Sequence, residues 1–343
     1  MKRIFLALTC MLLLAGCSES GSNDNKENAS SALETGNDSR NDTTGVLESG
    51  KGLPTSVSSI DDYIRRARFY LVNEQIGNAM GDIRNALMID ANNVDALLVL
   101  ADIYYALGSQ DNIILTLNKA TEVAPLDSRP IIKLAEMSFI QGNVNVSKAY
   151  IDKALELNSI NPQAYFLKGV ISISNNDTVQ ALKHFMTAKN QDDSFVDPVL
   201  QIADIYAAQR NPLARDFYDL AIEIDPDNTV ANYSLAMFLQ DNGYPETALE
   251  IYDDLDAKMP GNYNVLFNKG YVNLVYLFNN DKAIEYFDKA LEVNPKSVDA
   301  LLNKGRAYEQ KGNFRQAKSI YLQILKDNPN YQLAIDALSR IGE

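Results

Sequence analysis

The sequence predicts an all-α solenoid in which about eight helix-turn-helix repeats stack and a short helix closes the C-terminal end. Two observations carry this prediction. From Ile60 onward, a pattern of small and apolar residues recurs about every 34 residues, which is a period typical of helical repeat proteins. Within each period, apolar residues follow helical spacing over stretches of about 12 to 15 residues, without the alternation of a strand.

The first sixteen residues have the layout of a signal peptide. Lys2 and Arg3 precede an apolar run from Ile4 to Leu14 that is too short to span a bilayer. The run ends in Leu14-Ala15-Gly16-Cys17, which resembles the lipobox of bacterial lipoproteins. This resemblance implies cleavage before Cys17 and acylation of that residue, for example with palmitate. An ordinary signal peptide followed by a chance cysteine is the alternative.

The expected lipid anchor also indicates a location. Ser18 follows the cysteine at the place where aspartate would resemble an inner-membrane retention signal. We therefore expect attachment to the outer membrane of the cell envelope, at its periplasmic face rather than at the cell surface. Residues 17–59 are rich in Ser, Asn, Asp and Gly and hold few large apolar residues, which favours a disordered tether. Its root-mean-square reach would be roughly 35 Å.

The repeated pattern divides the chain after residue 59 into regular units. The repeats span residues 60–93, 94–127, 128–161, 162–195, 196–228, 229–262, 263–297 and 298–331, and residues 332–343 form the expected capping helix. The eighth position is always small, as expected where the two helices of a repeat approach most closely: Ala67, Ala101, Ala135, Gly169, Ala203, Ala236, Gly270 and Gly305. The fifth repeat is one residue short and the seventh is one residue long, both between the two helices.

The last repeat shows the pattern most clearly. Its small, aromatic, glycine and proline positions are Gly305, Tyr308, Gly312, Ala317, Tyr321 and Pro329. This spacing resembles that of the tetratricopeptide repeat (TPR), and the resemblance covers residues 60–331. It implies a right-handed superhelix with a concave groove, and a role in binding other proteins.

The resemblance also implies which residues contact a partner. In this family the groove is built mainly from the first helix of each repeat. The corresponding candidates are Asp102, Tyr105, Glu136, Phe139, Phe166, Asp204, Tyr233, Met237, Phe267 and Tyr271. Aromatic anchors among acidic neighbours suit proteins or peptides with apolar and basic segments. The alternative for each aromatic residue is packing against the adjacent repeat. Asp102 and Glu136 disfavour the family's clamp for a C-terminal carboxylate, because two acids would repel it.

Composition excludes several other classes of function. The net charge is −14, and nucleic-acid binding requires clustered Lys and Arg. His184 is the only histidine, so it lacks partners for a catalytic or metal site. We expect no enzymatic activity, no cofactor and no metal.

Two functions remain open. The first is a lipid-anchored scaffold or adaptor for envelope proteins, such as those of pilus, secretion or cell-wall machinery. The alternative is a lipoprotein that presents a glycan, nutrient or wall fragment to a transporter.

Overall fold

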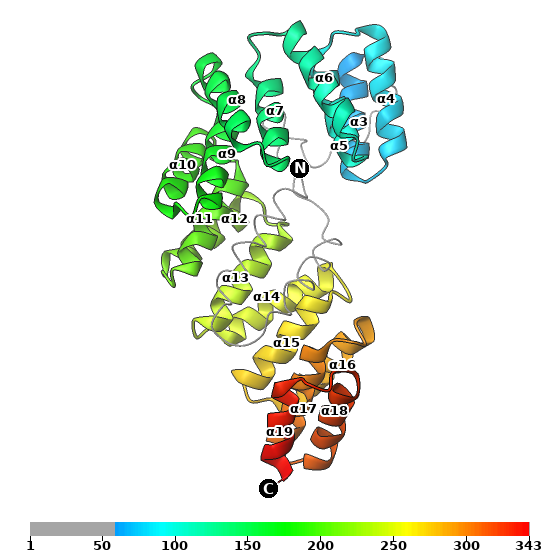
Figure 1. The fold of residues 1–343 in the computed structure, drawn as a ribbon, viewed down its shortest axis with the longest axis vertical. Helices are drawn as coiled ribbons and strands as arrows, with labels where there is room; N and C mark the ends of the chain where they lie inside the picture. Colours follow the sequence, from blue (N-terminus) through cyan, green and yellow to red (C-terminus); the bar gives the residue numbers. More distant parts are fainter. Residues whose placement is uncertain (1–58, 343) are drawn as a thin grey trace. The chain divides into compact units, whose positions relative to one another are not determined.

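The computed structural model describes residues 59–342, which form seventeen α-helices and no strand. The predicted all-α fold of helix-turn-helix repeats is therefore confirmed. The expected signal peptide, Cys17 and the tether up to residue 58 lie outside the described residues. The described chain forms two compact units, residues 59–208 and 209–342, which are coloured from blue to green and from green to red in Figure 1.

Unit 1 consists of four helix pairs and one further helix. The first helix of a repeat is called helix A here, and the second is called helix B. The pairs are α3 (Ile60–Val72) with α4 (Ile76–Ile89), α5 (Val94–Ala106) with α6 (Gln110–Val123), α7 (Ser128–Ile140) with α8 (Val144–Leu157), and α9 (Pro162–Ser174) with α10 (Thr178–Gln191). The unit ends with α11 (Val196–Ala208), the helix A of the fifth repeat.

Unit 2 begins with a helix B and ends with an added helix. It starts at α12 (Leu213–Ile224) and continues through the pairs α13 (Thr229–Asp241) with α14 (Pro245–Lys258), α15 (Tyr263–Val275) with α16 (Asn280–Val293), and α17 (Val298–Gln310) with α18 (Phe314–Asp327). The final helix is α19 (Gln332–Gly342). Within this unit each pair packs against the next (Figure 1).

Polar residues mark the start of nearly every helix A. The side chain at the N-cap accepts a hydrogen bond from a backbone N–H that would otherwise lack an intrahelical partner. These caps are Ser59, Asn93, Asp127, Asn161, Asn228, Asn262 and Ser297. The residue before α11 is instead Phe195, which is buried and packs against Phe166 with ring centroids 5.4 Å apart. Phe195 therefore contributes to the core instead of capping the helix.

The turn between helices A and B contains a residue with positive φ in every repeat. In four repeats this residue is a glycine, as expected for the left-handed region: Gly108, Gly142, Gly243 and Gly312. In the other four it carries a side chain, with φ between 54° and 58°: Glu74, Asn176, Arg210 and Phe278. Such a conformation costs about 1–2 kcal/mol for most L-residues. The turns without glycine are therefore strained.

The small eighth position lies directly against helix B. A Cβ added to Gly305 would lie 2.4 Å from Cε1 of Tyr321, and one added to Gly169 would lie 2.4 Å from Cε1 of Phe185. Both rings are completely buried. The prediction that this position marks the closest approach of the two helices is confirmed.

Ion pairs connect neighbouring repeats at an equivalent place. A lysine on helix A reaches an aspartate on the preceding helix B in three repeats, and the pairs are Lys168–Asp152 at 3.1 Å, Lys269–Asp253 at 2.8 Å and Lys304–Asp288 at 2.5 Å. Lys269 is 5% exposed and is also 2.7 Å from Asp256. These contacts fix the register between one repeat and the next.

The helix α19 covers the end of the last pair. Ala334 and Ala337 are buried against the core that includes Tyr321, while Gln332, Asp336 and Arg340 remain exposed. A terminal helix with one polar face seals a repeat stack, so the predicted capping helix is confirmed. None of the described helices is both long and apolar enough to cross a membrane.

Candidate functional site

The helices A of neighbouring repeats lie side by side within each unit. Contacts join α3 to α5 and α7 to α9 in unit 1, and join α15 to α17 in unit 2. Side chains from successive helices A therefore share one surface in each unit, which we call the helix-A face. All ten candidate contact residues lie on helices A, six in unit 1 and four in unit 2.

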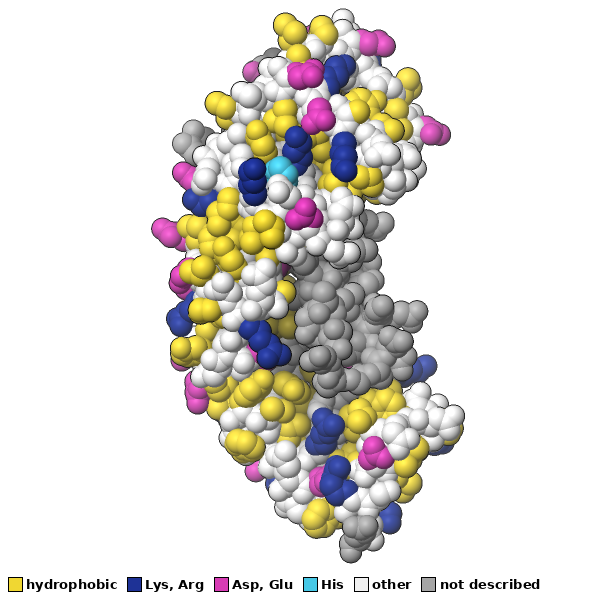
Figure 2. Space-filling view, turned by 60° about the vertical axis from the view of Figure 1, so that its left-hand side comes forward, with side chains coloured by type: hydrophobic (Ala, Val, Ile, Leu, Met, Phe, Trp, Pro, Cys, Tyr) yellow, Lys and Arg dark blue, Asp and Glu magenta, His cyan; other side chains and the backbone are white. Residues whose placement is uncertain are grey.

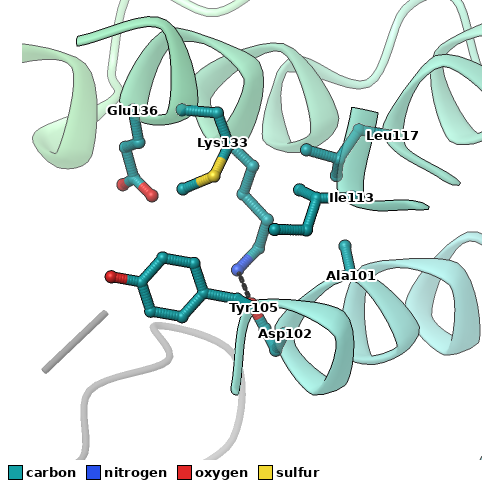
Figure 3. A pocket seen from close by; sticks show the side chains of 8 residues that line it. Ala101, Asp102, Tyr105, Ile113, Leu117, Lys133 and Glu136 are labelled. Carbon is teal, nitrogen blue, oxygen red and sulfur yellow. Dashed lines mark hydrogen bonds and ion pairs between the residues drawn. The ribbon is translucent and has the colours of Figure 1, made fainter. Parts of the chain in front are cut away.

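In unit 1, α5 and α7 bring three of the candidates together around a small hollow. Asp102 and Tyr105 come from α5, and Glu136 comes from α7 (Figure 3). Ile113 and Leu117 of α6 line the apolar side, and the space inside is about 20 Å³. A volume of this size holds a water molecule or two. The hollow is therefore too small for an organic ligand.

Lys133 changes the charge of this hollow. Its ammonium donates a hydrogen bond to Asp102 at 2.6 Å, and both side chains are less than one-fifth exposed (Figure 3). Lys133 was not among the predicted residues, although it lies three positions before Glu136 on the same helix. Asp102 is thus paired within the protein rather than held ready for a cationic partner.

The remaining candidates of unit 1 differ in their exposure. Phe139 on α7 is partly exposed. Phe166 on α9 is only 4% exposed and lies between the rings of Phe185 and Phe195, each 5.4 Å away. Asp204 on α11 is also buried. The structure thus places Phe166 in the core, in agreement with the packing alternative.

In unit 2, two of the partly exposed candidates, Phe267 and Tyr271, belong to a continuous row of aromatic rings. Tyr263, Phe267 and Tyr271 follow one another four residues apart on α15, so they project from one face of the helix. The ring centroids of Tyr263 and Phe267 are 5.9 Å apart at 27°, and those of Phe267 and Tyr271 are 6.3 Å apart at 17°. Tyr276 adds an edge-on contact to Tyr271 at 6.2 Å. These four residues are called the aromatic row below.

Hydrogen bonds hold both ends of the aromatic row. The Tyr263 hydroxyl lies 2.5 Å from Oγ of Ser297, the residue that caps α17. At the other end, the Tyr276 hydroxyl donates to Asp241 on α13 at 2.9 Å. Burial raises the pKa of both phenols, and for Tyr276 the neighbouring Asp241 carboxylate raises the pKa further. The row therefore stays neutral near pH 7 and is linked to the repeat on each side.

The helix α13 extends the apolar surface beside the row. Tyr233 and Met237 are partly exposed on this helix. The Tyr233 hydroxyl accepts a hydrogen bond from Asn268 on α15 at 2.8 Å, and its ring lies 5.9 Å from the buried ring of Tyr252. Four predicted residues, Tyr233, Met237, Phe267 and Tyr271, thus come from two adjacent helices of one surface.

Sequence reasoning missed both ends of the aromatic row. Tyr263 is the first residue of its helix and Tyr276 is the residue that ends it, so both fall outside the positions taken from the family pattern. Spacing alone could have revealed Tyr263, because it precedes Phe267 by four residues.

Several acids of the helix-A face are paired within the protein. Asp95 pairs with Arg129 at 2.6 Å, Asp102 pairs with Lys133, and Glu309 pairs with Arg340 at 2.6 Å. In unit 2, Asp241 accepts a hydrogen bond from Tyr276 and remains exposed. Among these acids, Asp241 has only a neutral donor, so it is the one best placed to attract a cationic group.

The single histidine lies among cations on the surface (Figure 2). Partial burial lowers the pKa of His184, and the charges of Lys168 and Lys183 lower it further. Its ring lies 6.4 Å from that of Tyr165. Within residues 59–342, no group of three or more His, Cys, Asp or Glu side chains is arranged to hold a metal ion.

Comparisons with known proteins point to one family. Residues 276–341 match the sequence model of the tetratricopeptide repeat. The chain is 31% identical over 146 residues to the uncharacterized protein ycf37 of Guillardia theta, across 41% of this chain and 74% of that protein. It is 25% identical over 175 residues to the photosystem I assembly protein Ycf3 of Synechococcus sp., across 44% of this chain and 91% of that protein.

The fold has a counterpart among solved structures. A structure of human IFIT1 is similar with a TM-score of 0.60 and 18% identity, across 83% of this chain and 71% of that chain. This similarity concerns the arrangement of helices alone.

Proposed function

Because the chain belongs to the tetratricopeptide repeat family, we propose that it is a non-catalytic scaffold that holds other proteins together in the bacterial cell envelope. The general role, a repeat scaffold for protein–protein interaction, is that of the family. The finer proposal is that the chain is lipid-anchored and assists the assembly of an envelope complex such as pilus, secretion or cell-wall machinery.

The aromatic row on α15 is the observation that carries the proposal. Its rings, with Tyr233 and Met237 of α13, form a partly exposed apolar surface that spans two repeats. Buried aromatic anchors dominate the binding energy of protein interfaces, because they offer a large contact area at a low cost in conformational entropy. Since the rings already stack on one another, they are ordered before a partner arrives.

The chemistry of the surface defines the partner it fits. The apolar rings suit an extended or helical peptide with spaced apolar side chains. The exposed carboxylate of Asp241 at the end of the row suits a Lys or Arg in the same segment. We therefore propose a partner with an apolar segment followed by a basic residue.

The alternative of a glycan-binding lipoprotein fits the geometry less well. The apolar face of a bound sugar packs best on the open face of an aromatic side chain. Here Tyr263, Phe267 and Tyr271 are near-parallel neighbours along a single helix, with ring centroids 5.9 and 6.3 Å apart. The rings are therefore spread along α15 rather than gathered in an enclosed pocket with convergent polar groups, which a small-molecule ligand requires.

The proposed location rests on the N-terminal sequence. Lipidation of Cys17 would attach the chain to the outer membrane at its periplasmic face, with residues 18–58 between the lipid and the repeats. If this is so, replacing Cys17 by Ser will move the protein out of the acylated fraction, as shown by loss of labelled palmitate. Incorporation of label by the Cys17→Ser variant would refute the anchor without affecting the proposal for the aromatic row.

The protein-binding proposal is tested by comparing variants in co-purification. Tyr271→Ser combined with Met237→Ser removes apolar contacts from the helix-A face. As a control, Leu322→Ser changes an exposed residue on α18, a helix B. We expect the double variant to lose the proteins that co-purify with the wild type and the control to retain them. Identical protein partners for all three forms would refute the proposal.

A further inference from the structure

Unit 2 exposes a second set of aromatic side chains, which lie at its turns rather than on a helix A. Tyr244 is 50% exposed, Phe278 is 72% exposed and Phe314 is 53% exposed. They lie at the turn between helices A and B in three successive repeats. Tyr244 caps α14, Phe278 lies two residues before α16, and Phe314 is the first residue of α18. Since the turns of stacked pairs follow one edge, these three aromatic corners form a row along that edge.

Folding of the turns does not account for these side chains. Phe278 has a φ of 54°, where glycine would be relaxed and where asparagine is the side chain best tolerated. Phenylalanine has neither the conformational freedom of glycine nor the tolerance of asparagine for this φ. Most of the Phe278 side chain is also exposed to water. A strained residue that leaves a large apolar group exposed points to a use of that group outside the folded core.

One aromatic corner has a cation in contact with its ring, and exposed cations follow the other two corners closely in the sequence. The Arg215 guanidinium lies over the Tyr244 ring, 5.5 Å from its centroid. Lys282 follows Phe278 by four residues and Arg315 follows Phe314 directly, and both are exposed. The acid at this edge of the seventh repeat, Asp281, is paired with Lys311. In a chain with a net charge of −14, an exposed cation thus lies over one of the three rings and within four residues of each of the other two.

Aromatic rings beside Lys and Arg are typical of groups that lie in the interface of a lipid bilayer. The rings occupy the boundary between head groups and acyl chains, and the flexible cations reach the lipid phosphates. We propose that the aromatic corners Tyr244, Phe278 and Phe314 dock on the surface of a phospholipid bilayer. None of these three residues belongs to a helix A, so the inference goes beyond protein binding and does not depend on it.

The arrangement favours a bilayer over a protein as the occupant. The three rings project from separate turns, one repeat apart, and a protein partner would need a matching cavity for each of them. A fluid interface accommodates separate rings without such a match. Docking would also direct unit 2 toward the membrane, so that a partner on the helix-A face would be held near it.

A single tryptophan tests this proposal, because the chain contains none. In the full-length protein, Phe278→Trp places a fluorescent probe at the most exposed corner. The probe is added to vesicles of phosphatidylethanolamine and phosphatidylglycerol, with and without bromine on the acyl chains. We expect the emission to move to shorter wavelength on vesicles and to be quenched by the brominated lipid. Adding Phe314→Ser should reduce both effects.

The matched control is Leu126→Trp in unit 1. Leu126 is 82% exposed and lies in the turn between the second and third repeats, which belong to unit 1. The N-terminal region is the same in both proteins, so any attachment through it affects both equally. We expect the control to keep its solvent-exposed emission on vesicles. An unchanged spectrum for Phe278→Trp, or equal quenching of the control, would overturn the proposal.

Discussion

Gly305 and Tyr321 show how one residue sets the distance between two helices. The ring of Tyr321 occupies the space that a Cβ on Gly305 would need, so helices α17 and α18 can approach only because that Cβ is absent. The same arrangement joins Gly169 to Phe185 and Gly270 to Phe287. Small residues at this position are therefore a requirement of packing, and they carry no information about a partner.

Replacement of Gly305 by alanine should destabilise unit 2. The added Cβ would lie 2.4 Å from Tyr321, a ring that is completely buried. We expect the free energy of unfolding to fall by about 1–3 kcal/mol, as is usual for overpacking of a core. Urea denaturation measures this change. The control is Gly81→Ala within α4, where no atom lies within 4 Å and where alanine should add about 0.5–1 kcal/mol. Equal effects of the two changes would contradict this explanation.

Ser147 offers the opposite case, in which alanine should stabilise the protein. Ser147 is fully buried on α8, and its hydroxyl finds no hydrogen-bond partner within the described chain. Ser147→Ala should raise the free energy of unfolding by about 1 kcal/mol, because an unsatisfied buried group is removed. Ser138 is a matched control, since its buried hydroxyl donates to the carbonyl oxygen of Leu134 at 2.8 Å. A similar gain for Ser138→Ala would show that hydrogen bonding does not explain the effect.

At the scale of elements, substitutions in the turns between helices A and B can distinguish an effect on stability from an effect on lipid binding. Phe278→Gly should raise the free energy of unfolding by about 1 kcal/mol, since glycine relaxes the positive φ. Thermal denaturation measures the gain, and Glu74→Gly at the equivalent φ of 58° provides the comparison. We expect both variants to be stabilised, and only the change at Phe278 to weaken association with lipid vesicles. A destabilised Phe278→Gly protein would refute the strain argument.

The capping helix α19 is held by an acid-sensitive contact. Glu309 accepts hydrogen bonds from Arg340 on α19 at 2.6 Å and from the Tyr321 hydroxyl at 2.8 Å. The bond from Arg340 is the main cause that lowers the pKa of Glu309. A lowered carboxyl pKa stabilises the fold above the ordinary value of about 4.3, and this contribution is lost as the pH falls through the lowered value.

Hydrogen exchange at the amides of α19 should therefore accelerate in acid. We expect protection at neutral pH and faster exchange of this helix, before that of α15, as Glu309 becomes protonated. Glu309→Gln should exchange rapidly in α19 already at neutral pH and show a weaker dependence on acid. If α19 in the wild type exchanged at a rate independent of pH after correction for intrinsic chemistry, the contact would not hold the cap.

At the scale of the whole molecule, repetition explains why the fold could be predicted. Small residues, caps and helical spacing act within one repeat, so they recur in the sequence from one repeat to the next. The charge of the helix-A face could not be predicted in this way. Pairs such as Asp95 with Arg129 join residues of adjacent repeats, and their formation depends on the register between repeats. The burial of Phe166 likewise depends on Phe195, which replaces a polar cap in the next repeat.

The binding surface was predictable in part for a related reason. Phe267 and Tyr271 occupy family positions, whereas Tyr263 and Tyr276 join them through stacking and through hydrogen bonds to neighbouring repeats. The aromatic corners had no family position to indicate them. The surfaces that distinguish this protein thus include residues for which the family pattern predicts no role.

Photo-crosslinking in intact cells tests the central claim, that the aromatic row binds protein, most directly. A benzophenone amino acid placed at Tyr271 reports on the row, and the same group at Leu322, which is 51% exposed on α18, reports on a helix B. We expect a discrete protein adduct from position 271 after irradiation, and none from position 322. Absence of an adduct at position 271, or the same adduct from both positions, would contradict it.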